Sequence, residues 1–244
     1  MSRARASGAE RAGSFWRTGV RALRPARSYA EPVHGLTPAD LVEAALRAGV
    51  RDQRVLEALE TVPRAAFAPS GGGTDPYLDV PLPIPHAQVT TQPSLVAKML
   101  EALSLSGSER VLEIGTGYGF QTALLAWVAA FVWSVERWGD LAATARANLS
   151  ANGVRSVEVV VGDGTEGLAA HAPYDAVVVS AAFPAVPTPL AEQLVEGGRL
   201  VQPIGSGGDE QVVLFVKRKG RLEQRRFVTG AHFVRLYGRH GFAP

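Results

Sequence analysis

The sequence predicts a doubly wound α/β fold, in which a mostly parallel seven-stranded sheet is covered by helices on both faces. Three observations support this prediction. From Arg110 onward, short apolar runs alternate with helical patterns, and repeated strand–helix–strand units favour parallel strands. The first of these strands runs into a glycine-rich loop. The last two strands follow one another without a helix, which indicates an antiparallel hairpin at the edge of the sheet.

The N-terminal part of the domain is expected to form a helical layer over residues 35–105. Thr37 is a suitable N-cap and Pro38 suits a first helical turn, so a helix begins there and continues to Gly49. The elements that follow are expected to be a helix over 53–61, a loop over 68–76, an extended segment over 77–85 and a helix over 92–103.

The remaining residues, 106–244, are expected to form the sheet and the helices that cover it. Strands are predicted near 110–115, 131–136, 157–161, 174–180, 198–203, 211–217 and 230–237. Helices are predicted near 119–129, 139–151, 164–169 and 187–195. Both parts together are expected to form one domain over residues 35–244, because the chain length suits a single hydrophobic core.

Composition limits the classes of function. The 244 residues contain no cysteine, which excludes a disulfide framework, a thiol nucleophile and a zinc–thiolate site. No apolar run reaches the roughly 20 residues that span a bilayer, so no membrane partner is expected. His171, His232 and His240 are too dispersed along the chain to indicate a metal site. A monomer in the cytoplasm is expected.

Residues 1–34 are expected to be a basic, disordered extension. Residues 1–30 contain seven arginines and one acid, whereas the remaining 214 residues contain 18 Lys and Arg against 22 Asp and Glu. The extension has no apolar core of a secretory signal. Nucleic acid is not the expected partner, but a basic arm of this kind leaves a cofactor-binding scaffold on nucleic acid as a distant alternative.

The strongest functional signal lies in residues 110–120, where the first apolar strand runs into Gly115, Gly117 and Gly119. Glycines allow a tight turn and a close approach of the backbone to a ligand, beside the N-terminus of the next helix. The following strand ends in Glu136, twenty-one residues after Gly115. An acid at that distance is placed to accept hydrogen bonds from ribose hydroxyls, so the pattern predicts a nucleoside site.

Among nucleosides, S-adenosylmethionine fits this pattern best. A dinucleotide fingerprint would need Gly or Ala where the chain has Phe120, and no Gly-Lys-Ser/Thr follows to form a Walker loop. A cationic sulfonium suits a glycine loop that is flanked by carboxylates, such as Glu113 before it and Asp163 after the third strand. The predicted cofactor-binding residues are Glu113, Gly115, Thr116, Gly117, Gly119, Glu136, Arg137, Asp163 and Gly164.

Beyond the glycine loop, the chain resembles the protein-L-isoaspartate (D-aspartate) O-methyltransferase family over about residues 38–242. Segments 55–69 and 77–84 match, and three further segments are more particular to the family: Gln88-Val-Thr-Thr-Gln-Pro93, Ala172-Pro-Tyr-Asp-Ala-Val-Val-Val-Ser-Ala-Ala182 and Gln193-Leu-Val-Glu-Gly-Gly-Arg-Leu-Val-Gln-Pro-Ile204. The resemblance implies a Rossmann-like class I S-adenosylmethionine-dependent methyltransferase. It also implies methyl transfer to the α-carboxylate of L-isoaspartyl residues in damaged proteins, and repair through a methyl ester and a succinimide.

The resemblance further implies which residues serve the acceptor. Thr91 stands at the family's catalytic serine position and keeps a hydroxyl. The implied substrate-binding residues are Val89, Thr90, Gln92, Pro93 and Gln211. Two positions depart from the family pattern, because Val89 replaces a threonine and Arg235 replaces a proline. These departures keep one rival open, the methylation of a normal aspartate in a dedicated peptide to form an aspartimide.

The expected chemistry needs little catalytic equipment. A carboxylate acceptor is already ionised at neutral pH, so no general base is required and His86, close to the acceptor segment, is not assigned as one. Residues 180–183 (Ser-Ala-Ala-Phe) offer no side-chain amide or carboxylate to receive an N–H donor, which disfavours amine methylation.

Overall fold

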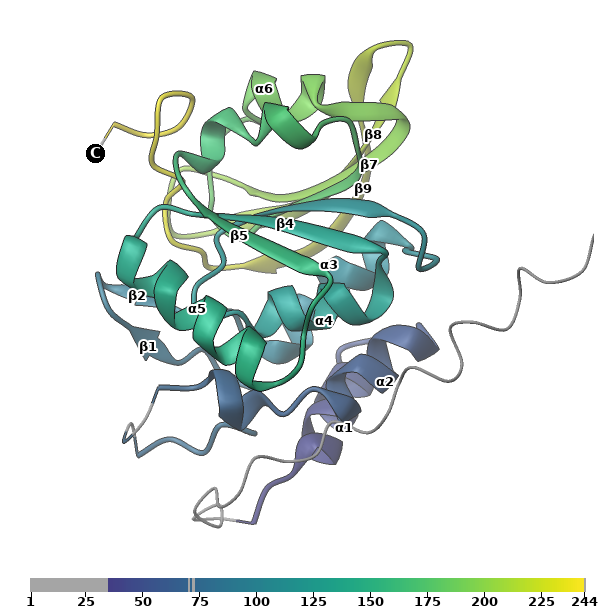
Figure 1. Cartoon of the computed structure of the whole chain (residues 1–244). Helices are drawn as coiled ribbons and strands as arrows, with labels where there is room; N and C mark the ends of the chain where they lie inside the picture. Colours follow the sequence, from purple (N-terminus) through teal and green to yellow (C-terminus); the bar gives the residue numbers. More distant parts are fainter. Residues whose placement is uncertain (1–34, 70, 72, 244) are drawn as a thin grey trace, which may run out of the picture.

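Seven strands form one sheet in the computed structural model, which describes residues 35–243 apart from 70 and 72 (Figure 1). The strands are β3 (Arg110–Ile114), β4 (Phe131–Glu136), β5 (Val157–Val161), β6 (Tyr174–Val179), β7 (Leu194–Ile204), β8 (Glu210–Arg218) and β9 (Arg221–Ala231). Their order across the sheet is β5-β4-β3-β6-β7-β8-β9. The chain therefore leaves β3 in one direction and later returns to its other side, which places a crevice at the carboxyl ends of β3 and β6.

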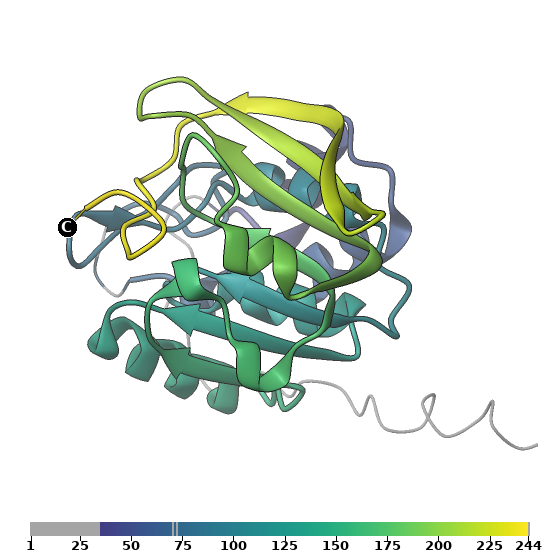
Figure 2. The same ribbon diagram turned by 90° about the horizontal axis from the view of Figure 1, so that it is seen from above.

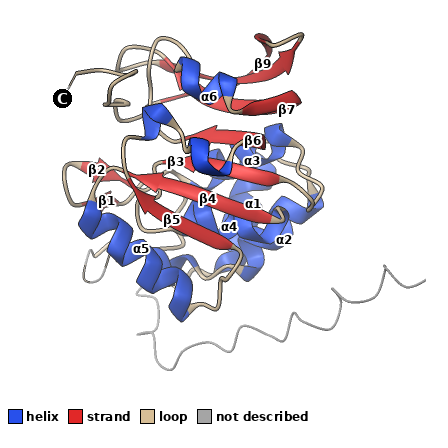
Figure 3. Cartoon of the chain, turned by 45° about the horizontal axis from the view of Figure 1, so that its top comes forward, coloured by secondary structure: helices blue, strands red, loops and turns tan. Residues whose placement is uncertain are grey.

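The strands from β5 to β7 run parallel, and β8 and β9 are antiparallel to their neighbours. Figure 3 shows β9 at one end of the sheet and β5 at the other. These observations confirm the predicted doubly wound sheet with an antiparallel edge hairpin.

Helices cover the two faces of the sheet unequally. One face carries α3 (Pro93–Leu103), α4 (Phe120–Val128) and α5 (Gly139–Ala151), with α1 (Pro38–Arg47) and α2 (Gln53–Thr61) packed outside α3 and α4. The other face carries α6 (Thr188–Glu192) and two short 3₁₀ turns. Figure 2, seen from that side, shows that these short helices leave β8 and β9 uncovered. No helix in the described part of the chain is long and apolar enough to cross a membrane.

The protein has two hydrophobic cores, one on each face of the sheet, because successive side chains of a strand alternate between the faces. Val111, Val132 and Ala176 pack with the large helical layer, whereas Leu112, Val177 and Leu200 pack beneath α6. All six side chains are fully buried. Since successive residues of a strand point to opposite faces, a parallel strand covered on both sides must be apolar throughout.

Three predicted elements differ from the structure. The helix predicted over 164–169 is replaced by 3₁₀ turns at Gly164–Glu166 and Ala169–His171, separated by Gly167 at φ 67°. The helix predicted over 187–195 is only α6, because β7 begins early, at Leu194. The last strand is β9 rather than 230–237, because Lys219 and Gly220 at φ 50° and 72° turn the chain straight back after β8.

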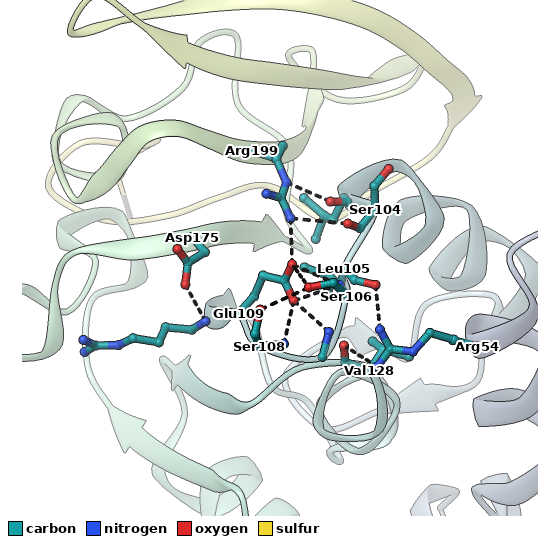
Figure 4. Close-up of polar contacts among 12 residues, drawn as sticks. Arg54, Ser104, Leu105, Ser106, Ser108, Glu109, Val128, Asp175 and Arg199 are labelled. Atoms are coloured by element: carbon teal, nitrogen blue, oxygen red, sulfur yellow. Dashed lines mark hydrogen bonds and ion pairs between the residues drawn. The ribbon is translucent and has the colours of Figure 1, made fainter. Parts of the chain in front are cut away.

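A buried carboxylate joins the helical layer to the sheet (Figure 4). Glu109 accepts hydrogen bonds from the backbone N–H groups of Ser106, Gly107 and Ser108 at 2.9–3.1 Å, and Arg199 of β7 lies 3.4 Å from it. Nearby, Arg54 of α2 donates to the carbonyl groups of Leu105 and Val128, which follow or end α3 and α4. The loop that leads into β3 is therefore held from both sides.

Candidate active site

A cavity of about 520 Å³ opens at the carboxyl ends of β3 and β4. Its walls come from residues 84–91, the glycine loop, the end of β4 and residues 234–237. Of the predicted cofactor-binding residues, those that line it are Gly115, Thr116, Gly117, Glu136, Arg137 and Gly164. The volume lies in the range of small-molecule sites, about 300–1,000 Å³.

The glycine loop and Glu136 form the floor of this first cavity. Gly115, Gly117 and Gly119 have φ values of 93°, 56° and 93°, a region that favours glycine. The Glu136 carboxylate is 5% exposed and accepts the N–H of Gly117 at 2.9 Å and of Trp138 at 3.0 Å. A carboxylate oxygen can accept more than one hydrogen bond, so Glu136 retains capacity for ribose hydroxyls at the cavity. These residues fit the nucleoside part of S-adenosylmethionine.

Glu113 lies behind the cavity rather than in its lining. Its side chain points to the helical face, where Gln121 Nε2 donates to Oε1 at 2.9 Å and Thr122 Oγ1 donates to Oε2 at 2.5 Å. Complete burial raises the pKa of Glu113 to about 7, although these hydrogen bonds act to lower it. Glu113 therefore supports the glycine loop through the first turn of α4 and is not part of the cavity lining.

Asp163 likewise lies outside the cavity lining. Its carboxylate accepts the backbone N–H groups of Thr165 at 2.8 Å and Arg239 at 2.7 Å. Burial alone would raise the pKa of Asp163, but the hydrogen bonds from Thr165 and Arg239 lower it. Asp163 therefore fixes the C-terminal segment against the sheet, and only its neighbour Gly164 reaches the cavity. Gly119 shapes the start of α4 and is also outside the lining.

Three aromatic residues at the mouth of the first cavity were not among the predicted site residues. The rings of His86 and Trp138 stack with centroids 3.9 Å apart, and Arg137 lies over both Trp138 and Tyr237. His86 Nε2 also lies 2.9 Å from the Asp140 carboxylate. Trp138 follows the carboxyl end of β4, and this position is a sequence signal for the site, whereas His86 and Tyr237 lie outside the strands of the seven-stranded sheet.

A second cavity, of about 1,040 Å³, adjoins the first. Its walls include four of the five predicted substrate residues, Val89, Thr90, Gln92 and Gln211, together with the catalytic candidate Thr91. Pro93 is buried at the start of α3 and lines neither cavity. Phe227 of β9, which is 53% exposed, contributes an apolar side chain to this cavity.

The loop that carries Thr91 is held by two charged residues. Arg64, 1% exposed, donates to the carbonyl groups of Leu78 and Val80 at 2.6 and 2.7 Å, and lies 3.4 Å from the Thr90 hydroxyl. Burial lowers the pKa of Arg64 to about 10. Asp79 accepts the N–H of Ser94 at 2.8 Å, at the first turn of α3. Arg64 and Asp79 therefore hold the segments on either side of Thr91, and neither residue contacts the Thr91 hydroxyl.

The two cavities meet at a shared wall, which consists of Val89, Thr90, Thr91, Ser180 and Val234. The Thr90 hydroxyl is engaged by the N–H of Leu82 at 3.0 Å. The half-buried Thr91 hydroxyl has no hydrogen-bond partner among the described residues. A group bound in one cavity can therefore react with a group bound in the other beside the free hydroxyl of Thr91.

Comparison with known proteins decides the family. The model of the protein-L-isoaspartate(D-aspartate) O-methyltransferase family matches residues 37–241. The chain belongs to this family. A protein-L-isoaspartate O-methyltransferase of Methanoculleus marisnigri is 50% identical over 204 residues, which cover 83% of this chain and 92% of the relative. One of Koribacter versatilis is 45% identical over 210 residues, covering 86% and 94%.

Solved structures of the family share the fold. One protein-L-isoaspartate O-methyltransferase aligns with a TM-score of 0.75 at 28% identity, covering 84% of this chain and 67% of its own. A Plasmodium falciparum family member in complex with S-adenosyl-L-homocysteine aligns with a TM-score of 0.69 at 20% identity, covering 83% and 99%. The predicted Rossmann-like methyltransferase fold is thereby confirmed.

Proposed function

We propose that this protein transfers a methyl group from S-adenosylmethionine to the α-carboxylate of L-isoaspartyl residues, as an enzyme of protein repair. Family membership over residues 37–241 supports the reaction. The observation that carries the proposal is the shared wall, where the free hydroxyl of Thr91 lies between a nucleoside-sized cavity and a wider one. The wider cavity, with its exposed apolar side chains Val89 and Phe227, suits a stretch of peptide.

The described residues fit the demands of this reaction. When bound, S-adenosylmethionine supplies an electrophilic methyl group. Glu136 and the glycine loop would hold its nucleoside part, and Thr91 would donate a hydrogen bond to one oxygen of the acceptor carboxylate. Because that carboxylate is already ionised, the protein needs only to orient it and exclude water.

The test is a methyl-transfer assay on two peptides of the same sequence, one with L-isoaspartate and one with L-aspartate. We expect methyl transfer to the isoaspartyl peptide only. The methyl ester that forms should be unstable, because it converts to a succinimide. Transfer to the aspartyl peptide alone would instead favour the alternative function, aspartimide formation in a dedicated peptide. The departures of Val89 and Arg235 from the family pattern keep this alternative open. No transfer to either peptide would overturn the proposal.

We also propose that the enzyme acts as a monomer in the cytoplasm. Both cavities are built from one chain, so a second copy is not needed to complete the site. Size-exclusion chromatography with light scattering and fractionation of expressing cells test the two statements separately. Nucleic acid is not proposed as a partner, because residues 31–244 contain 18 Lys and Arg against 22 Asp and Glu.

A further inference from the structure

Ser180 follows the last residue of β6, at the point where the two cavities meet. It lines both cavities, a property that it shares with only four other described residues. It also lies directly across from the glycine loop: a Cβ atom built on Gly115 would be 3.4 Å from the Ser180 Cβ. Ser180 is therefore next to both the loop of the methyl donor and the cavity of the acceptor.

A buried relay orients the Ser180 hydroxyl. Gln121 Nε2 donates one hydrogen bond to the Ser180 Oγ at 2.9 Å and another to Glu113 Oε1 at 2.9 Å. When Glu113 is ionised, as it is above about pH 7, the reverse orientation of the Gln121 amide would place its oxygen against a carboxylate, so the amide hydrogens face Glu113 and Ser180. In this orientation Gln121 Oε1 is buried without a hydrogen-bond partner among the described residues. Both amide hydrogens of Gln121 are then used.

The direction of this hydrogen bond determines what Ser180 can do. Because Ser180 Oγ accepts from Gln121, its own O–H hydrogen is available, and it donates no hydrogen bond to the described residues. A hydroxyl has one donor and two acceptor positions. The free donor thus lies at a shared wall whose other free hydroxyl is that of Thr91.

We infer that Ser180 is a second substrate-positioning residue, whose hydroxyl donates to the acceptor carboxylate alongside Thr91, with Gln121 holding it in place. The inference rests on the proposed function. In the transfer, one carboxylate oxygen forms a bond to the methyl carbon while the carbon–sulfur bond breaks and its electron pair stays on sulfur. No proton moves, so two hydroxyl donors can fix the carboxylate without a base.

Replacement of Ser180 by alanine tests this role. We expect S180A to lower kcat/KM for the isoaspartyl peptide roughly tenfold or more, the range for a hydrogen bond to a charged group. The Kd for S-adenosylhomocysteine should stay within about twofold of the wild-type value. The melting temperature should stay within a few degrees of wild type, because only one oxygen is removed. A parallel loss of cofactor affinity would place Ser180 in the cofactor site and overturn the inference.

The pair Ser180→Thr and Ser180→Val separates the hydroxyl from its bulk, because the two side chains have the same shape. S180T should retain clearly more activity than S180V, and equal rates in the two variants would overturn the inference. Gln121→Leu should add little further loss in the S180A background if Gln121 acts through Ser180. If the losses of activity in the two single variants added fully in the double variant, the proposed role of Gln121 would be contradicted.

The same assay distinguishes the inference from the function on which it rests. An inactive wild type overturns the proposed function and the Ser180 role together. An active wild type with unchanged S180A overturns the Ser180 role alone.

Discussion

Two neighbouring threonines in the acceptor loop have different environments and therefore different roles. The Thr90 hydroxyl is engaged by Leu82 and Arg64, whereas the Thr91 hydroxyl is free at the wall between the cavities. The resemblance to the family implies that Thr91 is the catalytic residue. The structure adds the reason why Thr90 cannot substitute for it.

Replacement of Thr91 by alanine is expected to slow methyl transfer roughly 10- to 100-fold, because one hydrogen bond to a charged acceptor is lost. Affinity for S-adenosylhomocysteine should remain near that of wild type, since Glu136 and the glycine loop are untouched. Steady-state kinetics and calorimetric titration measure the two quantities. Thr91→Ser, which keeps the hydroxyl, serves as the control and should stay within a few-fold of wild type. Equal losses in both variants would make Thr91 a packing residue.

Glu113 makes the stability of the protein depend on pH near neutrality. Its folded pKa, about 7, is raised above its ordinary value of 4.5 by burial. Stability from this group is therefore fully present below pH 4.5 and is lost as the pH rises through about 7, up to about 3 kcal/mol in all. Urea unfolding at pH 5 and pH 8 should show a smaller drop for Glu113→Gln than for wild type. Identical drops would contradict the assigned pKa.

At the scale of elements, the Glu109 carboxylate is one of the groups that hold the loop before β3. Burial alone would raise the pKa of Glu109, but hydrogen bonds from the Ser106 backbone and hydroxyl and from Gly107 outweigh it and lower the pKa to about 2. A carboxyl group with a lowered pKa contributes stability above pH 4.5 that is lost as the pH falls toward 2. The contribution at neutral pH is about 3 kcal/mol at most.

Glu109→Gln is accordingly expected to destabilise the protein by about 2–3 kcal/mol at pH 7, with a smaller difference from wild type near pH 3. Chemical denaturation at the two pH values measures this. Glu60→Gln, at an exposed position of α2, is the matched control and should change stability by less than about 0.5 kcal/mol. A Glu109 difference that is the same at both pH values would show that packing, not charge, holds the loop.

Elements with strong periodicity were predictable, and those stabilised by their neighbours were not. The apolar strands β3, β4 and β6 are buried on both faces, so their sequences identify them. In contrast, β9 contains Arg221, Glu223 and Arg225, whose side chains are exposed at the edge of the sheet, and its polar sequence resembles a loop. The first 3₁₀ turn after β5 forms where the Asp163 carboxylate accepts the N–H of Thr165, a contact that no helical pattern predicts.

At the scale of the whole molecule, residues 35–243 contain both cavities and every residue proposed for binding or catalysis. Deletion of residues 1–34 is therefore expected to leave turnover of the isoaspartyl peptide within about twofold of the full chain, because all of these residues stay in the shortened protein. The full-length protein is the control, and both are assayed at the same ionic strength. A tenfold loss would assign the basic segment a part in catalysis or substrate capture.

The candidate site was only partly predictable from the sequence, for a geometric reason. Position along a strand identified Glu136 and the glycine loop, because carboxyl ends of parallel strands meet at one edge. It could not tell that Glu113 and Asp163 lie outside the cavity lining. Nor could it pair Ser180 with Gln121, since that hydrogen bond crosses from a strand end to a helix 59 residues earlier in the chain.

The charged edge strand β9 has a consequence for how copies of the protein meet in solution. Its outer rim exposes backbone groups that could pair with the edge of another sheet, the route by which many sheet proteins aggregate. The three arginines Arg221, Arg225 and Arg226 lie exposed along that rim. Two such rims approaching one another would bring these arginines together, and the single acid of β9, Glu223, does not cancel their positive charge. The strand that was hardest to recognise in the sequence is thus well suited to keep concentrated solutions of the protein free of fibrous assembly.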